Sequence, residues 1–303
     1  MTVNEKILNV QTPDEGRVPG FLVETEWLAR HLDDPGLLVF DCTANMVVDP
    51  IVQQRVHAER AAFEAGHIKG AQFIDIDLDL SDKWHRYHLM LPNAADFKRS
   101  IERLGVSNDS TVVIYSTGNI WWATRVWWML RVYGFDHAHI LNGSYKKWVA
   151  EGRPVETGPS QPRAQGNFVP TPPAPLVASL EDVKAALNDD QTCLINALRP
   201  AQFSGEEMPR KGRPGRIPRS ISLPAANVLT ADGRFLEGEA LHEVLHNAGV
   251  KGGERVITYC GGGVSASAVA FVLMMSGHPD VRIYDASLAE WGSDLSLPME
   301  RDL

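Results

Sequence analysis

The chain is 303 residues long, which is enough for two domains of ordinary size, and its apolar content of 44% is that of a globular protein. Its formal net charge of −9 gives no overall basic field, so we expect no nucleic-acid partner. Residues 1–20 lack a basic segment followed by an apolar run, and no stretch of about 18 apolar residues occurs. We therefore expect a cytoplasmic protein with no membrane partner.

Apolar strands alternate with helical patterns along both halves of the chain. In the first half the predicted strands are 37–41, 71–76, 112–115 and 139–141. In the second half they are 193–197, 221–223, 255–259 and 281–284, and helical patterns cover 180–187, 239–248 and 267–275. Such alternation predicts an α/β fold in which each sheet is parallel and has helices on both faces.

The two halves also repeat each other. Matched pairs of segments are 112–116 with 256–260, 139–143 with 282–286, and 66–71 with 215–220. A tryptophan, Trp148 or Trp291, closes each copy. The division that follows is a first domain at 15–155, a linker rich in proline, glycine and glutamine at 156–172, and a second domain at 173–303. Since Ser116 stands where the second copy has Cys260, at most one domain can perform thiol chemistry.

One of the three cysteines stands in a loop suited to anion binding. Cys260 ends a strand and is followed by Gly261, Gly262 and Gly263, and then by Val264 and Ser265, which open a helix. Consecutive glycines let backbone N–H groups form a concave nest, and the helix start adds further unpaired N–H groups. A thiolate is stabilised in such a setting. Cys42 and Cys193 have no such loop, so we interpret both as structural, and we expect neither a metal nor a cofactor.

Over most of its length the chain resembles the tandem-domain rhodanese superfamily. The resemblance rests on the duplication, the Cys260 loop and several shared motifs, namely His67–Ala71, Met90–Pro92, Arg125–Arg131, Tyr284–Asp285 and Glu290–Asp294. It implies two rhodanese-like domains, of which only the second is catalytic. It also implies a sulfurtransferase of the thiosulfate or 3-mercaptopyruvate type, in which Cys260 carries a sulfane sulfur as a persulfide to a thiol or cyanide.

Three positions bear on the donor, and two of them, Gly262 and Leu198, depart from the family pattern. Gly261 resembles the mercaptopyruvate type, in which no cationic side chain follows the cysteine, whereas Gly262 replaces the usual hydroxyl residue. Leu198 stands where the family has arginine, and Arg199 follows one place later. A loop without cationic side chains favours 3-mercaptopyruvate, with one carboxylate, over dianionic thiosulfate.

Candidate groups for binding the anionic donor lie outside the loop. Arginines from 199 to 219 could hold a carboxylate, in particular Arg199, Arg210 and Arg216, although a solvated loop explains them equally well. By the resemblance, His67 could face the active loop and assist proton transfer. Trp121 and Trp122 are interpreted as core or interdomain packing.

Three alternative functions are weighed against this interpretation. Gly261, Gly263 and Ala266 also fit a dinucleotide fingerprint, but fewer than 20 residues follow Asp285, too few to complete that fold. A cysteine phosphatase would need an arginine at position 266, which is alanine. The remaining alternative is a catalytically silent rhodanese-like binding or scaffold protein.

Overall fold

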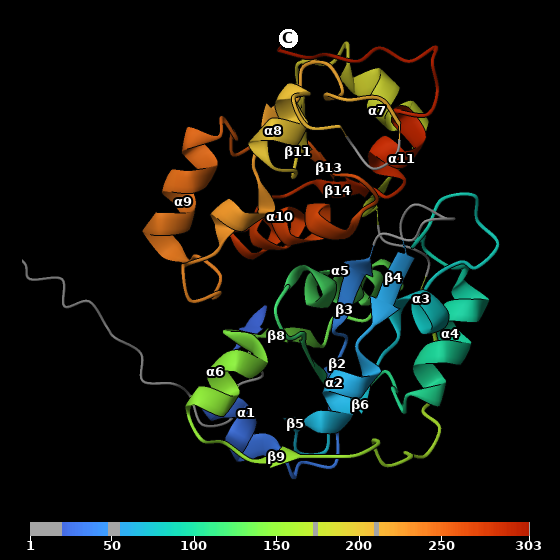
Figure 1. Cartoon of the computed structure of the whole chain (residues 1–303), viewed down its shortest axis with the longest axis vertical. Helices are drawn as coiled ribbons and strands as arrows, with labels where there is room; N and C mark the ends of the chain where they lie inside the picture. Colours follow the sequence, from blue (N-terminus) through green and yellow to red (C-terminus); the bar gives the residue numbers. More distant parts are fainter. Residues whose placement is uncertain (1–19, 48–54, 172–174, 209–211, 303) are drawn as a thin grey trace, which may run out of the picture.

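The computed structural model describes residues 20–47, 55–171, 175–208 and 212–302. It contains two five-stranded sheets in which every neighbouring pair of strands is parallel. The strand orders are β1-β8-β7-β2-β6 and β10-β14-β13-β11-β12. Strand for strand, the second order is the first order repeated, which confirms the predicted duplication and the α/β fold. Figure 1 shows the first half, in blue to green, below the second half, in yellow to red.

The first domain builds its sheet from strands near those predicted. Its sheet strands are β1 (Leu22–Val23), β2 (Leu37–Asp41), β6 (Gln72–Phe73), β7 (Thr111–Tyr115) and β8 (Ala138–Leu141). Two antiparallel pairs add β3 (Ala44–Val47) with β4 (Arg55–Ala58) and β5 (His67–Ile68) with β9 (Val155–Glu156). The helices are α1 (Thr25–His31), α2 (Arg60–Ala65), α3 (Ile76–Leu80), α4 (Ala94–Arg103), α5 (Trp121–Val132) and α6 (Ser144–Ala150).

Within its described residues, the second domain repeats this plan without a counterpart of the β3-β4 pair. Its strands are β10 (Val177–Ala178), β11 (Thr192–Asn196), β12 (Ile221–Ser222), β13 (Arg255–Tyr259) and β14 (Val281–Tyr284). Its helices are α7 (Leu180–Ala186), α8 (Pro200–Ser204), the 3-10 turn η1 (Ala225–Val228), α9 (Gly238–Asn247), α10 (Val264–Met275) and α11 (Ser287–Trp291). None of the helices in the described ranges is long and apolar enough to cross a membrane.

The strand predicted at 71–76 is wrong beyond its first residues. Only Gln72–Phe73 pairs with β2, and Ile76 already begins α3. The Asp75 side chain accepts a hydrogen bond from the N–H of Leu78, which caps the helix and ends the strand. The apolar pattern of residues 71–76 alone did not show that Asp75 caps a helix and marks the boundary between β6 and α3.

Equivalent side chains make the same hydrogen bonds in both domains. The hydroxyl of Tyr115 accepts from the N–H of Ile68 at 3.2 Å, and that of Tyr259 accepts from the N–H of Ile217 at 3.1 Å. The indole N–H groups of Trp148 and Trp291 each donate to a proline carbonyl at 2.8 Å. The repeat therefore extends from strand order to individual buried polar contacts.

One apolar core runs through both domains, because α5 and α10 pack against each other between the two sheets (Figure 1). The ring of Trp127 on α5 meets that of Phe271 on α10 edge to face at 4.8 Å. Both helices are buried nearly all round, as helices enclosed on every side should be. The outer faces of the two sheets have separate cores, under α1, α2 and α6 in the first domain and under α7 and α11 in the second.

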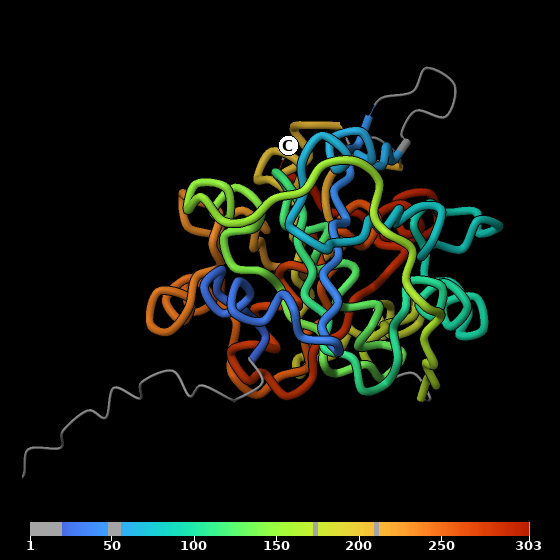
Figure 2. The backbone as a smooth tube through the Cα atoms, turned by 90° about the horizontal axis from the view of Figure 1, so that it is seen from below, coloured from blue at the N-terminus to red at the C-terminus, as the bar shows by residue number. Residues whose placement is uncertain are grey.

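The segment predicted as an extended linker lies along the first domain. Figure 2 shows it in yellow-green, crossing in front of the blue and cyan parts of that domain. Backbone hydrogen bonds tie it to the domain at Gly158, Gly166 and Thr171, and the side chain of Phe168 is fully buried. From 157 to 171 it forms no helix or strand, but it is fastened along its length.

Candidate active site

Cys260 lies where β13 ends and the loop to α10 begins, at the carboxyl edge of the second sheet. Its N–H donates to Ser287 Oγ at 3.0 Å, and its carbonyl accepts from the N–H of Leu288 at 3.1 Å. The carbonyl of Gly261 accepts from the N–H of Ala289 at 3.0 Å. These bonds fasten the loop to the start of α11, so the cysteine is held on rigid elements rather than on a mobile turn.

Only one of the three loop glycines needs its left-handed conformation. Gly263 has φ +77° and precedes α10, and a Cβ there would lie 2.6 Å from Asp285 Oδ1 and 2.8 Å from Arg125 Nη1. A Cβ at Gly261 or Gly262 would meet nothing within 4 Å. Among the described residues, no acceptor bonds the N–H groups of Gly261 or Gly262. These donors are therefore available to an anion beside Cys260.

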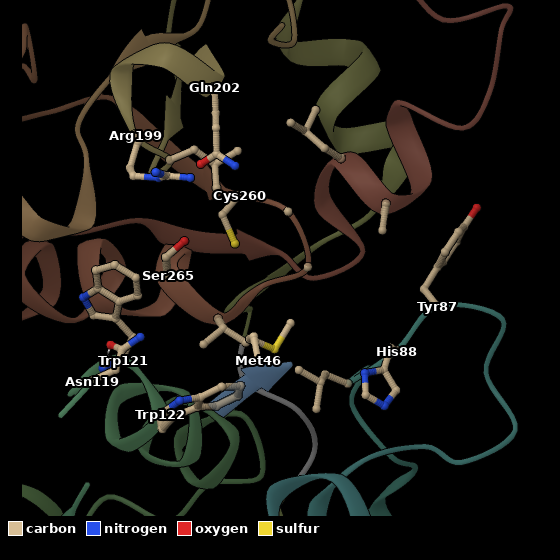
Figure 3. Close-up of a pocket in the computed structure, with 17 residues that line it drawn as sticks. Met46, Tyr87, His88, Asn119, Trp121, Trp122, Arg199, Gln202, Cys260 and Ser265 are labelled. Atoms are coloured by element: carbon tan, nitrogen blue, oxygen red, sulfur yellow. Dashed lines mark hydrogen bonds between the residues drawn. The ribbon is translucent and has the colours of Figure 1, made fainter. Parts of the chain in front are cut away.

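A cavity of about 290 Å³ opens over the Cys260 thiol, and both domains line it. Figure 3 shows the sulfur pointing into it, with Arg199 and Gln202 on one side and Met46 and Trp122 on the other. The full lining is Met46, Tyr87, His88, Leu89, Asn119, Trp121, Trp122, Leu198, Arg199, Gln202, Cys260, Gly261, Gly262, Val264, Ser265, Leu288 and Ala289. Binding sites favour domain junctions and the carboxyl ends of parallel strands, and this cavity lies at both.

Trp121 and Trp122 pack in the core between the domains, as predicted, and both also line the cavity. They begin α5, whose N-terminal end points toward the Cys260 loop across the interface. Trp122 is buried and Trp121 is half-buried. Sequence reasoning had no means of placing the start of one domain's helix against the loop of the other domain.

Of the predicted donor-binding arginines, Arg199 lines the cavity and Arg216 does not. The Arg199 side chain is exposed and forms an ion pair with Glu207 at 2.6 Å. Arg216 is wrong as a substrate-binding candidate, because it is buried against Phe203 and pairs with Glu300 at 2.9 Å and Asp302 at 2.7 Å. Arg210 lies outside the described residues.

His67 is also misplaced by the prediction. It is buried in β5, stacks on the ring of Phe63 at 3.9 Å, and its Nδ1 lies 2.9 Å from the carbonyl oxygen of Phe63. It lines a separate hollow beside β9, and β9 lies on the side of the first domain away from the second domain (Figure 1). The motif that contains His67 has a structural role here, because His67 and Ile68 form the antiparallel pair of β5 with β9.

A different histidine, which sequence reasoning missed, lines the cavity. His88 comes from the loop between α3 and α4, and its Nε2 lies 2.8 Å from Asp77 Oδ1. In the view of Figure 3 it lies on the first-domain side of the site, farther from Cys260 than Met46 does. Its neighbour Leu89 has positive φ, 65°, so a turn at this point directs both side chains. The sequence signal that could have pointed to His88 and Leu89 is the family motif at Met90–Pro92, which follows them directly.

A buried ion pair joins the domains beside the loop. Arg125 Nη1 on α5 donates to Asp285 Oδ1 at 2.5 Å, and Arg125 Nη2 donates to the carbonyl of Leu89 at 2.5 Å. Asp285 Oδ2 also accepts from the N–H of Leu91 at 3.0 Å. The side chain of Arg125 is fully buried and bonds both domains. It therefore holds the second domain's loop and the first domain's cavity wall in fixed positions relative to each other.

The other two cysteines are in unreactive surroundings. Burial raises the pKa of the Cys42 thiol, and the nearby Asp41 carboxyl raises it further. Burial, followed by the nearby Glu254, raises the pKa of Cys193 to about 12. A thiol with a raised pKa is protonated at neutral pH, and the protonated form is a poor nucleophile.

Comparisons with known proteins agree with this architecture. Residues 24–151 and 179–294 each match the rhodanese-like domain. The sulfur carrier protein TtuD of Thermus thermophilus is 31% identical over 295 residues, which cover 93% of this chain and 97% of the relative. The 3-mercaptopyruvate sulfurtransferase of Escherichia coli is 32% identical over 283 residues, 92% of this chain and 98% of the relative.

A solved structure gives the same result. SseA from Escherichia coli, described as a 3-mercaptopyruvate sulfotransferase with the rhodanese fold, superposes with a TM-score of 0.77 and 29% identity, covering 89% of this chain and 99% of that one. The duplicated sheets, the strand, loop and helix around Cys260, and both matches to the domain model lead to one conclusion. The chain belongs to the rhodanese family and is a sulfurtransferase built from two rhodanese-like domains.

Proposed function

We propose that this protein moves a sulfane sulfur from 3-mercaptopyruvate, in preference to thiosulfate, to a thiol or cyanide through a persulfide on Cys260. The observation that carries the proposal is the position of Cys260 at the base of a cavity between the domains. Cys260 lies beside loop N–H groups that no acceptor in the described part of the chain bonds, and beside the first turn of α10. These dipoles stabilise the attacking thiolate. We also propose that Gly261, Gly262, Gly263, Val264 and Ser265 form the loop that holds the transferred sulfur.

The donor reaction balances without any further oxidant or reductant. The Cys260 thiolate attacks the donor sulfur, and an S–S bond forms as the C–S bond breaks. The electron pair of that C–S bond goes to carbon as the enolate of pyruvate, which then takes up a proton. His88, which pairs with Asp77, and Tyr87 are the titratable side chains of the first domain that line the cavity, and we propose His88 as the proton donor.

The preference for 3-mercaptopyruvate rests on charge. Among the described residues, Arg199 is the one arginine or lysine that lines the cavity, and the loop itself offers only backbone dipoles. One arginine can bind the single carboxylate of 3-mercaptopyruvate. Each missing charged contact costs about 1.5–3 kcal/mol, roughly one to two powers of ten in kcat/KM, so dianionic thiosulfate is the poorer donor.

Mass spectrometry of the intact protein tests the persulfide. After incubation with 3-mercaptopyruvate we expect one added sulfur per chain, removable by cyanide, in the native protein and none in Cys260→Ser. A protein that takes up no sulfur from either donor would instead be a silent binding or scaffold member of the family.

Steady-state rates with both donors and cyanide as acceptor test the donor preference. We expect Gly261→Arg with Gly262→Lys to reduce the difference in kcat/KM between the two donors, because the added charges help to bind thiosulfate. The loop can accept these side chains, since both positions open into free space and neither has positive φ. The matched control is Gly252→Arg with Gly253→Lys, which adds the same charges at equally open positions before the opposite end of β13. A native preference for thiosulfate, or an equal effect of the control, would contradict the argument from charge.

A further inference from the structure

We infer that the acceptor of this protein is a thiol carrying an apolar, preferably aromatic, group, and that this group binds to the cavity wall contributed by the first domain. We name this surface the acceptor wall and define it as Met46, Leu89, Trp121 and Trp122. The inference rests on the proposed persulfide function and specifies its second substrate.

The two sides of the cavity differ in chemistry. The acceptor wall holds two indoles, a thioether and a leucine, and the first domain's polar lining residues, Tyr87, His88 and Asn119, are not part of it. The cavity's arginine, Arg199, lies on the other side of the Cys260 sulfur, next to Gln202 (Figure 3). A donor carboxylate held by Arg199 therefore leaves the acceptor wall uncovered, and the wall faces the sulfur that the acceptor must reach.

The departures in this chain extend the apolar character across the cavity. Leu198 lies at the position of a family arginine and lines the cavity, as do Val264 and Leu288. The cavity of about 290 Å³ is at the lower end of the ~300–1,000 Å³ typical of small-molecule pockets. It holds the volume of about ten water molecules, which is more than a short thiol carboxylate fills. The remaining space is bounded mainly by apolar side chains.

The energetics favour an aromatic occupant. Indole faces bind aromatic rings by burial of apolar area and by offset or edge-to-face contact. Trp121 is only half-buried, so a ligand can still cover part of its surface. Covering one phenyl group should raise the rate constant of acceptor attack about ten- to a hundredfold. A hydroxyl or ammonium group in contact with these four side chains would lose its hydration without gaining a hydrogen bond from them.

The acceptor step is a simple exchange. The acceptor thiolate attacks the outer sulfur of the Cys260 persulfide, a new S–S bond forms, and the bond from Cys260 to that sulfur breaks. Cys260 leaves as a thiolate and the acceptor leaves as a persulfide, so atoms and electrons balance.

Single-turnover kinetics on sulfur-loaded protein test the inference separately from the donor reaction. The full-length protein is loaded, freed of donor, and mixed with phenylmethanethiol or with 2-mercaptoethanol. Each rate constant is divided by that thiol's rate constant with glutathione persulfide, which removes intrinsic nucleophilicity. We expect the corrected ratio to favour phenylmethanethiol by at least about tenfold.

Two substitutions on the acceptor wall and one control complete the test. Trp121→Ala and Met46→Ser, both at half-buried positions, should each lower the ratio toward one. Trp84→Ala should leave the ratio at its native value, since this tryptophan is on the same loop as His88 but 95% exposed. A native ratio near one, or an unchanged ratio in both wall variants, overturns the inference. Failure to load sulfur overturns the proposed function and the inference with it.

Discussion

The loops that follow β7 and β13 occupy equivalent places in the two domains, yet only the second holds a thiol over open space. In the first loop the hydroxyl of Ser116 donates to the carbonyl of Asn119 at 2.7 Å. The N–H of Thr117 donates to Thr43 Oγ1 at 2.7 Å, and the N–H of Trp121 donates to Asn119 Oδ1 at 3.0 Å. Side chains of the first domain thus occupy donors that an anion would need.

In the second loop, a Cβ added at Gly261 or Gly262 would meet no described atom within 4 Å. Gly261 and Gly262 stand at the positions of Thr117 and Gly118, and their N–H groups have no acceptor among the described residues. The comparison shows that one framework produces either a closed structural turn or an anion nest. The side chains in the turn determine which of the two forms. The strand order cannot determine it, because it is the same in both domains.

The largest expected effect is the loss of sulfur transfer in Cys260→Ser, by several powers of ten in kcat/KM. Cys42→Ala and Cys193→Ala should keep the activity and lose only stability, because their thiols have raised pKa values and do not line the cavity. Rates with 3-mercaptopyruvate and cyanide measure this.

The double variant Cys260→Ser with Ser116→Cys asks whether a thiol alone makes the first loop active. We expect it to take up no sulfur, because position 116 is fully buried and Thr43 and Asn119 already bond the loop. Sulfur on residue 116 in a mass spectrum would show that the identity of one side chain, not the filling of the loop, separates the domains.

Arg125→Leu should cost about 3–5 kcal/mol in the free energy of unfolding, because it leaves Asp285 without its buried partner. Activity should fall with it, since the pair holds the loop against the cavity wall. Arg103→Leu on α4 removes an exposed ion pair with Asp79 and should cost at most about 1 kcal/mol. Urea unfolding measures both, and equal costs would contradict the role given to Arg125.

Gly263→Ala and Gly118→Ala compare the two loops at positions with the same backbone conformation. Both glycines have positive φ, +77° and +85°, so both variants carry the left-handed strain of about 1 kcal/mol. At 263 the new Cβ also meets Asp285 and Arg125, whereas at 118 it meets nothing within 4 Å. We expect Gly263→Ala to cost about 1–3 kcal/mol more in urea unfolding, and a smaller difference would mean that the loop yields easily.

The smallest expected effect is on stability at mildly alkaline pH, a loss of about 1.4 kcal/mol at pH 10. The pKa of Cys193 is raised from 9.0 to about 12 in the folded state, so between these values the folded chain keeps a proton that the unfolded chain loses. The stability that this thiol contributes is present below pH 9 and is lost as pH rises toward 12, by at most about 1.4 kcal/mol per pH unit. Cys193→Ala should therefore flatten the decline of unfolding free energy above pH 9, and parallel curves would contradict the raised pKa.

Much of the architecture could be predicted because its signals are local. A duplicated order of apolar strands and the three glycines after Cys260 are visible over short windows, and periodicity and backbone freedom act at that range. The capped start of α3 was missed because one aspartate outweighed an apolar run. The structural positions of Arg216 and His67 were not predicted, because each residue is held by partners that are distant in the sequence.

By itself the sequence determined that two similar α/β domains follow one another and that Cys260 alone stands before a glycine loop and a helix. Only the tertiary structure decided what faces that cysteine. Trp121 reaches it because α5 packs on α10, Met46 reaches it from β3, and Arg125 meets Asp285 across 160 residues of chain. The physical reason is that a loop's conformation follows from its own residues, whereas a cavity between domains is shaped by packing that no short window of sequence contains.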